Sequence, residues 1–310
     1  MALLSRLSRL SSRRGPRVAA LTMVRDEALM LPRWLAHYGV QLGHDHLVVI
    51  DDGSTDGSTD GLDGPGGIGV EVIRDPDHQG LPFERARMRI VSAVASRLLR
   101  SHDAVIFTDC DELLLPDPAH ADGLLDYLAR RPEPVLAGIG FNLVHRLDRD
   151  DEPPLDPARP VLGQRRDGFV VPRLSKPSIK RADARWRFAS HGIEAPFAPD
   201  PHLLLLHLKY ADAGLLRVTG DHRRRLHAET GLGPRSAWAS TGEEQVTWLR
   251  QVLAGRPEPA YLDPEKVLRD HPDGLVRQRG EAWETTGLRE TVAMSEGELV
   301  RLPDRFLHLV

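Results

Sequence analysis

The chain has 310 residues, close to the upper limit for one hydrophobic core, and its 41% apolar and 28% charged residues are ordinary for a globular protein. Its net charge of −4 argues against bulk nucleic-acid binding, and its single cysteine excludes an intrachain disulfide or a Cys-based zinc site. No apolar run approaches the roughly 20 residues of a membrane-spanning helix, and a cytoplasmic protein fits these features best.

The first 17 residues differ in charge from the rest of the chain. They carry five arginines and no acidic residue. We expect a flexible basic arm over 1–17. A solvated tail is the simpler interpretation, and peripheral contact with anionic lipid or with a partner is the alternative.

Short apolar runs alternate with amphipathic stretches between residues 18 and 144. Short continuous apolar runs are typical of buried strands, whereas apolar residues at intervals of three and four predict helices. In chain order we expect strand Val18–Val24, helix 27–42, strands His46–Asp52 and Val70–Arg74, helix 83–100, strand Ala104–Thr108, helix Asp122–Arg131 and a strand over Val135–Val144. This alternation predicts an α/β fold, in which helices flank a mostly parallel sheet and ligands bind at the carboxyl ends of its strands.

The second half of the chain is less regular. Residues 148–168 are rich in Pro and Asp and predict a surface loop or lid. Beyond them we expect strands over Phe169–Leu174 and Leu203–Tyr210 and helices over 211–229 and 242–254. The pattern is weak from residue 259 onward, so we expect a helical or irregular C-terminal extension over 231–310.

Carboxylates gather where the second and the fourth predicted strands end. Asp51 and Asp52 suit a ribose hydroxyl or a base edge, and the alternative is a turn at Asp52-Gly53 with Ser54 or Asp56 as a helix N-cap. Of the three D-x-D pairs in the chain, only Asp109 and Asp111 follow a clean apolar strand. Two carboxylates so placed suit a hard cation such as Mg²⁺ or Mn²⁺, often shared with phosphate oxygens.

Two ordered segments combine several motifs: TMVRDEALMLPRWLAHYGVQLGHDHLVVIDDGSTDGS at 22–58 and FTDCDELLLP at 107–116. Together they resemble the family-2-like glycosyltransferases with a GT-A fold, and most closely the branch with R/K-N-E, E-W-L, G-x-D-H, D-D-x-S-T-D and D-x-D-E-F motifs. Asp26 stands where that branch commonly has Asn, and Leu113 where it commonly has Phe. The resemblance covers residues 18–116 well and 175–210 loosely, through KPSIKR, SHGIE and LLHLKY.

The resemblance implies a Rossmann-like GT-A catalytic domain over 18–230, with a nucleotide-binding half at 18–147 and an acceptor half at 148–230. It also implies a UDP- or GDP-sugar donor, an Mn²⁺ or Mg²⁺ ion, and a glycan, lipid-linked or small-molecule acceptor. By position, Asp51 and Asp52 match the nucleoside-binding acids, and Glu27 matches a first-loop acid near the base and ribose. Asp109 and Asp111 match the metal-binding pair, with Asp111 as the direct ligand.

Further polar residues are candidates for the remaining roles. Four basic residues are candidates for the diphosphate: Lys176, Lys180, Arg181 and Arg185. An inverting transfer also needs a general base on the acceptor hydroxyl, for which the candidates are Glu194, His191 and Asp212. His207, in a strand of leucines, is either a hydrogen-bonded core histidine or a third metal ligand. His222 and His227 lie in a basic stretch and are expected to face solvent.

Three other kinds of protein compete with this interpretation. A phosphatase of the haloacid-dehalogenase type would place D-x-D after the first strand, and a sugar-nucleotidyltransferase would have a Gly-rich loop there instead of VRDEALM. A non-catalytic nucleotide- or glycan-binding protein with the same fold remains the alternative. The intact acids at 51, 52, 109 and 111 speak against this alternative. A purely structural role would not need four strand-end carboxylates, whose repulsion costs stability unless a cation or hydrogen bonds offset it. The sequence therefore predicts a metal-dependent, inverting glycosyltransferase.

Overall fold

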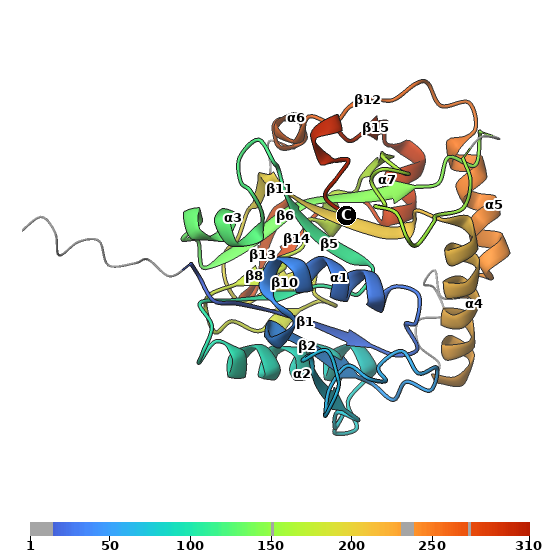
Figure 1. The fold of residues 1–310 in the computed structure, drawn as a ribbon. Coiled ribbons are helices and arrows are strands. Elements are labelled where there is room, and N and C mark those ends of the chain that lie inside the picture. Colours follow the sequence, from blue (N-terminus) through green and yellow to red (C-terminus); the bar gives the residue numbers. More distant parts are fainter. Residues whose placement is uncertain (1–14, 150–151, 231–238, 272–273) are drawn as a thin grey trace, which may run out of the picture.

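Two sheets form the centre of the protein in this computed structural model, which describes residues 15–149, 152–230, 239–271 and 274–310. Within these ranges the larger sheet has eleven strands, and helices lie on both sides of it (Figure 1). The predicted α/β class, a large sheet flanked by helices, is confirmed. Most of the predicted basic arm, residues 1–14, lies outside the described residues.

Four parallel strands form the part of the large sheet that the sequence predicts best. They are β1 (Val18–Val24), β2 (Leu47–Asp51), β3 (Glu71–Arg74) and β4 (Ala104–Phe107), in the spatial order β3-β2-β1-β4. The chain moves outward from β1 through β2 to β3 and then returns to the other side of β1. Ligands of open α/β sheets bind at the carboxyl ends of the strands beside such a reversal, which lies here between β1 and β4.

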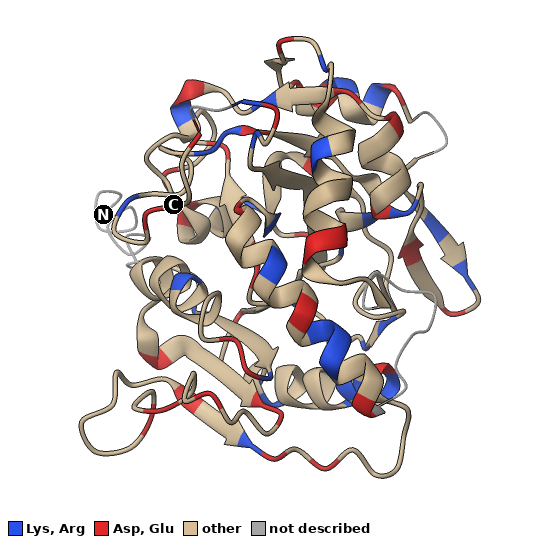
Figure 2. Cartoon of the chain, turned by 90° about the vertical axis from the view of Figure 1, so that its right-hand side faces the viewer, with Lys and Arg blue, Asp and Glu red and all other residues tan. Residues whose placement is uncertain are grey.

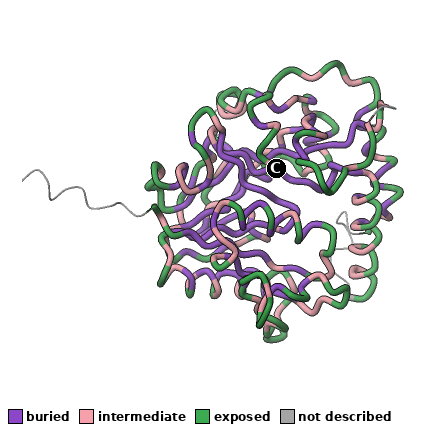
Figure 3. The backbone as a smooth tube through the Cα atoms, in the orientation of Figure 1, coloured by how far each residue is buried: buried purple, intermediate pink, exposed green. Residues whose placement is uncertain are grey.

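Helices cover both faces of this parallel part. Helices α1 (Leu31–Leu42) and α3 (Leu124–Arg130) pack on one face, and α2 (Phe83–Leu98) packs on the other (Figure 1). Successive residues of β1 alternate between the two faces, so that Ala20 joins the core under α1 and Leu21 the core under α2. Figure 3 shows the buried residues concentrated in the strands and along the inner sides of these helices.

Helix α1 begins four residues later than the expected start at residue 27. Residues 27–30 form a turn, and Asp26 before it has a φ of 56°, a left-handed conformation that Asp and Asn adopt more readily than most residues. The Asp26 carboxylate accepts hydrogen bonds from the backbone N–H of Thr55, at 2.6 Å, and of Asp56, at 3.2 Å. The loop after β1 is therefore fastened to the loop after β2.

Long-range pairing adds strands that the sequence pattern does not predict. The added strands are β5 (Glu112–Pro116) and β8 (Ile179–Lys180). Strands β7 (Asp167–Val170) and β11 (Pro199–Tyr210) begin earlier than expected, and β6 (Val135–Val144) has its expected bounds. Strand β11 runs antiparallel to β5 and parallel to β6, with His207 opposite both Glu112 and Asn142. Strands β7 and β8 are antiparallel to their neighbours, so antiparallel pairs accompany the parallel pairs of β1–β4 and of β6 with β11.

Two longer helices follow β11. Helix α4 (Ala213–Thr230) and helix α5 (Gly242–Leu253) pack against each other beside the carboxyl ends of the parallel strands (Figure 1). A capping box starts α5, in which Thr241 and Glu244 each accept a hydrogen bond from the other's backbone N–H. Figure 2 views the molecule from the side of these helices and shows both basic and acidic residues along α4.

The C-terminal segment contains strands where we expected helical or irregular structure. Its elements are β12 (Ala260–Tyr261), α6 (Pro264–Arg269), β13 (Val276–Arg279), β14 (Ala282–Thr285), α7 (Glu290–Glu296) and β15 (Leu299–Arg301). Strands β12 and β15 extend the large sheet, whereas β13 and β14 form the small sheet with β9 (Trp186–Arg187) and β10 (Gly192–Ile193). In the described part of the chain, no helix is long and apolar enough to cross a membrane.

The buried imidazole of His37 on α1 gives the fold a predictable response to pH. Burial lowers its pKa from 6.5 to about 4, so the folded protein keeps this ring neutral while the unfolded chain protonates it below pH 6.5. This ring alone should therefore lower the unfolding free energy by about 2 kcal/mol between pH 7 and pH 5, because the unfolded chain binds the proton that the folded protein excludes. Denaturant unfolding at both pH values should show a smaller difference for His37→Gln. His308→Gln, at an exposed position, should behave like the wild type, and equal differences in all three proteins would contradict this prediction.

Candidate functional site

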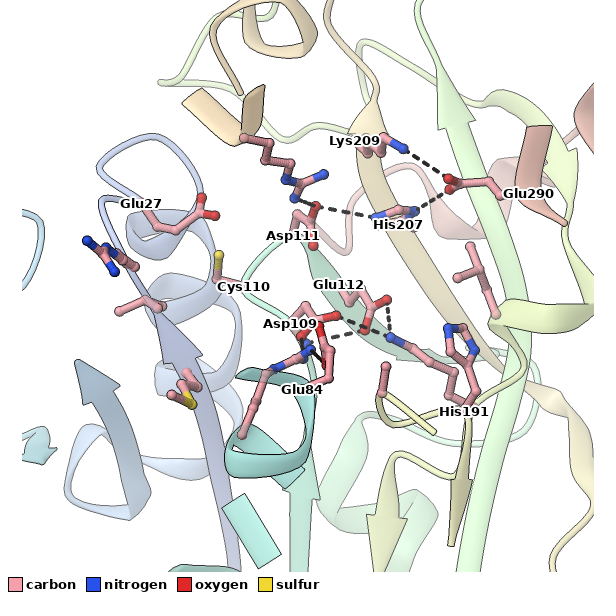
Figure 4. Close-up of a pocket in the computed structure, with 18 of the residues that line it drawn as sticks. Glu27, Glu84, Asp109, Cys110, Asp111, Glu112, His191, His207, Lys209 and Glu290 are labelled. Carbon is pink, nitrogen blue, oxygen red and sulfur yellow. Dashed lines mark hydrogen bonds and ion pairs between the residues drawn. The ribbon is translucent and has the colours of Figure 1, made fainter. Parts of the chain in front are cut away.

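A pocket of about 960 Å³ opens at the carboxyl ends of β1 and β4, where the strand order reverses. Several elements distant in sequence line it: the loop after β1, α2, the β4–β5 loop, β11, α4 and the start of α7. Figure 4 shows Glu27 on one side of this pocket, Asp109 to Glu112 at its centre, and His191, His207 and Glu290 on the other side. This is the edge of the sheet at which the sequence predicts ligand binding.

The predicted metal-binding pair lies on the floor of the pocket, but its two carboxylates have different partners. Asp109 pairs with Arg87 of α2 and with Lys176 Nζ at 3.3 Å, and Lys176 also pairs with Glu112 at 2.6 Å. Burial raises the pKa of Asp109, but Arg87 and Lys176 outweigh it and lower the value to about 2. Asp109 is therefore ionised at neutral pH and already neutralised by two cations of the protein.

Asp111 faces His207 instead. Its Oδ2 atom lies 3.3 Å from His207 Nε2 and 3.2 Å from a guanidinium nitrogen of Arg223 on α4. Burial acts to raise the pKa of this carboxyl, and His207 and Arg223 more than offset that effect, so the pKa lies well below the usual range. A carboxylate and an imidazole nitrogen therefore lie side by side at the pocket centre.

The far side of the His207 ring is held by residues of β6 and α7. His207 Nδ1 lies 2.7 Å from Asn142 Oδ1 and 3.3 Å from Glu290 Oε1, and both oxygens are acceptors for an Nδ1–H. The other Glu290 oxygen accepts hydrogen bonds from Lys209 Nζ at 2.9 Å and from the Tyr210 hydroxyl at 3.2 Å. Burial lowers the pKa of His207, but Asp111 and Glu290 raise it to about 10 overall.

The donor atoms at Asp111 and His207 suit a small divalent cation. No group of three or more His, Cys, Asp or Glu side chains within the described ranges has a metal-binding arrangement. However, Mg²⁺ and Mn²⁺ commonly take one or two protein ligands and complete their shells with water and phosphate oxygens. The Nδ1–H contacts orient the ring so that Nε2, once deprotonated, presents its lone pair beside the carboxylate. Asp111 and His207 therefore fit the predicted ion.

Two predicted nucleotide-binding acids line the pocket on the β1 and β2 side. Asp52 accepts a hydrogen bond from His78 Nε2 at 2.5 Å. Glu27 lies next to Cys110, and burial raises its pKa to about 7. Asp51 does not line the pocket, because its carboxylate accepts the Ser54 N–H at 2.8 Å and the Thr59 hydroxyl at 2.6 Å and thereby builds the loop after β2.

His191 is the one candidate general base that the structure places in the pocket. Its Nδ1 atom lies 2.9 Å from the carbonyl oxygen of Arg173, so Nδ1 carries the proton and Nε2 keeps its lone pair. Burial, aided by the nearby Lys176 charge, lowers the pKa of His191 to about 3. The ring is therefore neutral at physiological pH, with the Nε2 lone pair unprotonated.

The other two base candidates have structural partners outside this pocket. Glu194 accepts a hydrogen bond from Arg185 Nε at 2.8 Å and also pairs with Arg187, and these contacts hold its pKa below the usual range. Asp212 caps α4 by accepting the N–H groups of Gly214 and Leu215. The structure does not bring either carboxylate to the pocket.

Only Lys176 among the four predicted diphosphate-binding residues lines the pocket. Lys180 is buried, donates to the Ala184 carbonyl at 2.7 Å and lies over the Trp186 ring, and burial lowers its pKa to about 8. Arg181 donates to the carbonyl oxygens of Leu128 and Arg131. Arg185 pairs with Glu194. These three residues support the fold around β8 and β9 and not the pocket.

Several pocket residues were missed from the sequence. Arg87, Arg223 and Glu290 gave no local signal, because they act through contacts over 22, 112 and 83 residues of chain. Glu112 follows the D-x-D pair directly, and its position in the D-x-D-E run was the available signal. The expectation that His222 faces solvent was wrong, since this side chain lines the pocket from α4.

Comparisons with known proteins leave the family open. No protein-family model matches the chain, and no curated protein matches it. Among solved structures, a glucosyl-3-phosphoglycerate synthase from Mycobacterium tuberculosis is 20% identical, with a TM-score of 0.28, over 41% of this chain and 44% of that chain. A mannosyltransferase from Pyrobaculum calidifontis is 13% identical, with a TM-score of 0.36, over 84% of this chain and 81% of that chain. A mannose-1-phosphate geranyltransferase from Thermus thermophilus is 14% identical, with a TM-score of 0.28, over 94% of this chain and 76% of that chain. The chain spans less than half of the first of these proteins, and no TM-score reaches 0.5, so function has to be inferred from the site itself.

Proposed function

We propose that this protein is a metal-dependent glycosyltransferase that moves a sugar from a UDP- or GDP-sugar to an acceptor hydroxyl with inversion at the sugar carbon. The observation that carries the proposal is the Asp111–His207 pair, oriented by Asn142 and Glu290, at the strand reversal of an α/β sheet. We also propose that residues 18–147 bind the nucleotide and that 148–230 contribute to the acceptor side.

The pocket residues divide into three tasks. Asp52 and Glu27, at the ends of β2 and β1, are placed to bind the nucleoside. Asp111 and His207 would hold Mg²⁺ or Mn²⁺, which neutralises the charge that develops on the leaving diphosphate when bound. His191 offers a neutral Nε2 to the acceptor. The acceptor oxygen forms a bond to the sugar C1 while the bond from C1 to the phosphate oxygen breaks, and the acceptor proton passes to His191.

Isothermal titration of UDP and GDP into the full chain, each with and without Mn²⁺, tests the proposal. One nucleotide should bind at least about tenfold more tightly with the metal than without it. Binding that is independent of metal, with no hydrolysis or transfer of sugar from UDP-glucose or GDP-mannose, would instead favour a non-catalytic nucleotide-binding protein. Failure of both nucleotides to bind would contradict the proposal.

The assignment of the base predicts opposite outcomes for two neighbouring positions. His191→Ala should lower the rate of sugar transfer by about 10²- to 10⁴-fold, the usual contribution of general base catalysis, while nucleotide affinity stays within about twofold. Glu194→Gln should leave the rate within about twofold, because Glu194 is outside the pocket. Single-turnover rates at saturating donor would measure both. If Glu194→Gln lowered the rate of sugar transfer and His191→Ala did not, the base would be Glu194 and not His191.

A further inference from the structure

The cations that line the pocket fall into two groups. Four of them pair with carboxylates of the site: Arg87, Lys176, Lys209 and Arg223. The other three have neither an ion pair nor a side-chain hydrogen bond to any residue in the described part of the chain: Arg25, Arg173 and Arg289. Since none of these three guanidinium groups has a carboxylate partner of its own among the described residues, their N–H donors are available to a ligand in the pocket.

Arg173 and Arg289 belong to segments that lie together. Gly287 approaches the turn at Pro172–Leu174 so closely that a Cβ on Gly287 would be 3.0 Å from the Pro172 Cβ. The Thr285 hydroxyl donates to the Arg173 carbonyl at 3.0 Å, and the same carbonyl accepts the Nδ1–H of His191. The two arginines are therefore tied to the same part of the pocket as the proposed base. Arg25, in contrast, directly follows β1 on the nucleotide side.

The carboxylate next to Arg289 in the chain is not free to neutralise it. Both oxygens of Glu290 are engaged, one by Asn142 and His207 and the other by Lys209 and Tyr210. Arg173 likewise has no acidic side chain within 4 Å in the described ranges. A guanidinium presents a planar fork of donors that matches a carboxylate or a phosphate with two parallel hydrogen bonds. Both arginines line the same pocket as the proposed base, so their donors are available to an anionic group bound there.

We infer that the acceptor carries a carboxylate or a phosphate, and that Arg173 and Arg289 bind this group so that an acceptor hydroxyl reaches His191. The inference rests on the proposed function, because it assigns the acceptor class of the same site. The arginines recognise the anionic group but do not take part in the bond exchange, and they are specificity-determining residues.

Binding of three sugars to the full chain tests the inference: glucose, glucuronate and glucose 6-phosphate. Titrations are made with and without Mn²⁺ and UDP or GDP, on the wild type, Arg173→Gln, Arg289→Gln and the double variant. At least one anionic sugar should bind the wild type about tenfold more tightly than glucose, and the double variant should reduce this preference to about threefold or less. Whether glucuronate or glucose 6-phosphate gains more shows which anion the site prefers.

Arg100→Gln is the matched control, because Arg100 is exposed, has no ion pair within the described ranges and lies outside the pocket. It should keep the wild-type preference, and all variants should keep nucleotide affinity within about twofold. Three results would overturn the inference: no tighter binding of either anionic sugar, including no binding at all; a preference that survives in the double variant; or an equal loss in Arg100→Gln. The sugar titrations without nucleotide and metal test only the binding of the anionic group. The UDP and GDP titrations test the transferase proposal, so the failure of one proposal is distinguishable from the failure of the other.

Discussion

Asp111→Asn should weaken metal-dependent nucleotide binding by about 100-fold or more, the largest binding effect we expect of any single substitution in this pocket. The amide keeps the shape of the side chain but removes the charge that would neutralise a divalent cation, and it donates hydrogen where a metal needs a lone pair. Asp109→Asn should have a smaller effect, since both partners of Asp109, Arg87 and Lys176, stay charged, whereas His207 beside Asp111 can lose its proton and become a ligand itself. Titration of the nucleotide that binds the wild type, at fixed Mn²⁺, measures both.

Stability has to be followed alongside binding. Asp111→Asn leaves His207 and Arg223 without their counter-charge, and breaking a buried ion pair typically costs about 3–5 kcal/mol. Circular dichroism and thermal unfolding should show a folded variant with a lower melting temperature. Asp60→Asn changes an exposed carboxylate outside the pocket and should leave both binding and stability unchanged. If Asp111→Asn stays folded and binds nucleotide with the same dependence on Mn²⁺ as the wild type, Asp111 is not a ligand.

Glu290→Gln should weaken Mn²⁺ binding by about 10- to 100-fold, although Glu290 itself does not contact the expected ion position. Its carboxylate is one of two acceptors for the Nδ1–H of His207, and the amide that replaces it is a poorer acceptor. The ring then loses one of the two hydrogen-bond acceptors that fix its orientation, and the Nε2 lone pair is less firmly directed toward Asp111. The electron paramagnetic resonance signal of free Mn²⁺, titrated in the presence of the bound nucleotide, gives the affinity without an activity assay.

A control on the same helix separates this effect from a change in α7. Glu296→Gln lies in α7, is exposed and lines no part of the pocket, so its Mn²⁺ affinity should equal that of the wild type. Because Glu290 also neutralises Lys209, Glu290→Gln should lower the melting temperature as well. Unchanged Mn²⁺ affinity in a folded Glu290→Gln protein would mean that Asn142 alone holds the ring, and would remove Glu290 from the list of positioning residues.

The sequence predicted those parts of the fold that depend on local pattern. Val18–Val24 and Val135–Val144 appear with the expected bounds, because a short apolar run between polar turns has few alternatives to a buried strand. Strand β5, Glu112–Pro116, was missed because its identity depends on pairing with β11, which lies almost 90 residues further along the chain. The C-terminal strands β12, β14 and β15 are short and pair with partners distant in the chain, whereas β13 forms a local hairpin with β14 that the weak pattern after residue 259 did not indicate.

The candidate site residues also divide into those that a local sequence pattern locates and those that only long-range contacts locate. Asp52, Asp109 and Asp111 could be located because the carboxyl ends of parallel strands meet at one edge of the sheet, whatever the remaining topology. Lys180 and Glu194 could not be assigned from the sequence, because a basic or acidic residue in a loop gives no indication of which way it turns. Lys180 turns to the Ala184 carbonyl, and Glu194 turns to two arginines of its own hairpin. Glu290 is the opposite case. Nothing in its sequence context indicates a site residue, but the fold places its carboxylate beside His207.

Strand β11 makes the site sensitive to changes in chain length. The register of β11 with β6 is regular only from Leu204 to His207 and shifts on both sides of this stretch. An inserted or deleted residue within it would exchange the two faces of the strand and present leucine to Asp111 where His207 now stands. Natural variants of this protein should therefore differ in the length of surface loops such as 153–160 but keep the spacing from Leu204 to His207. Changes of the site itself are therefore expected to be substitutions, and a different loop is grafted onto this fold most safely at positions that leave β11 unchanged.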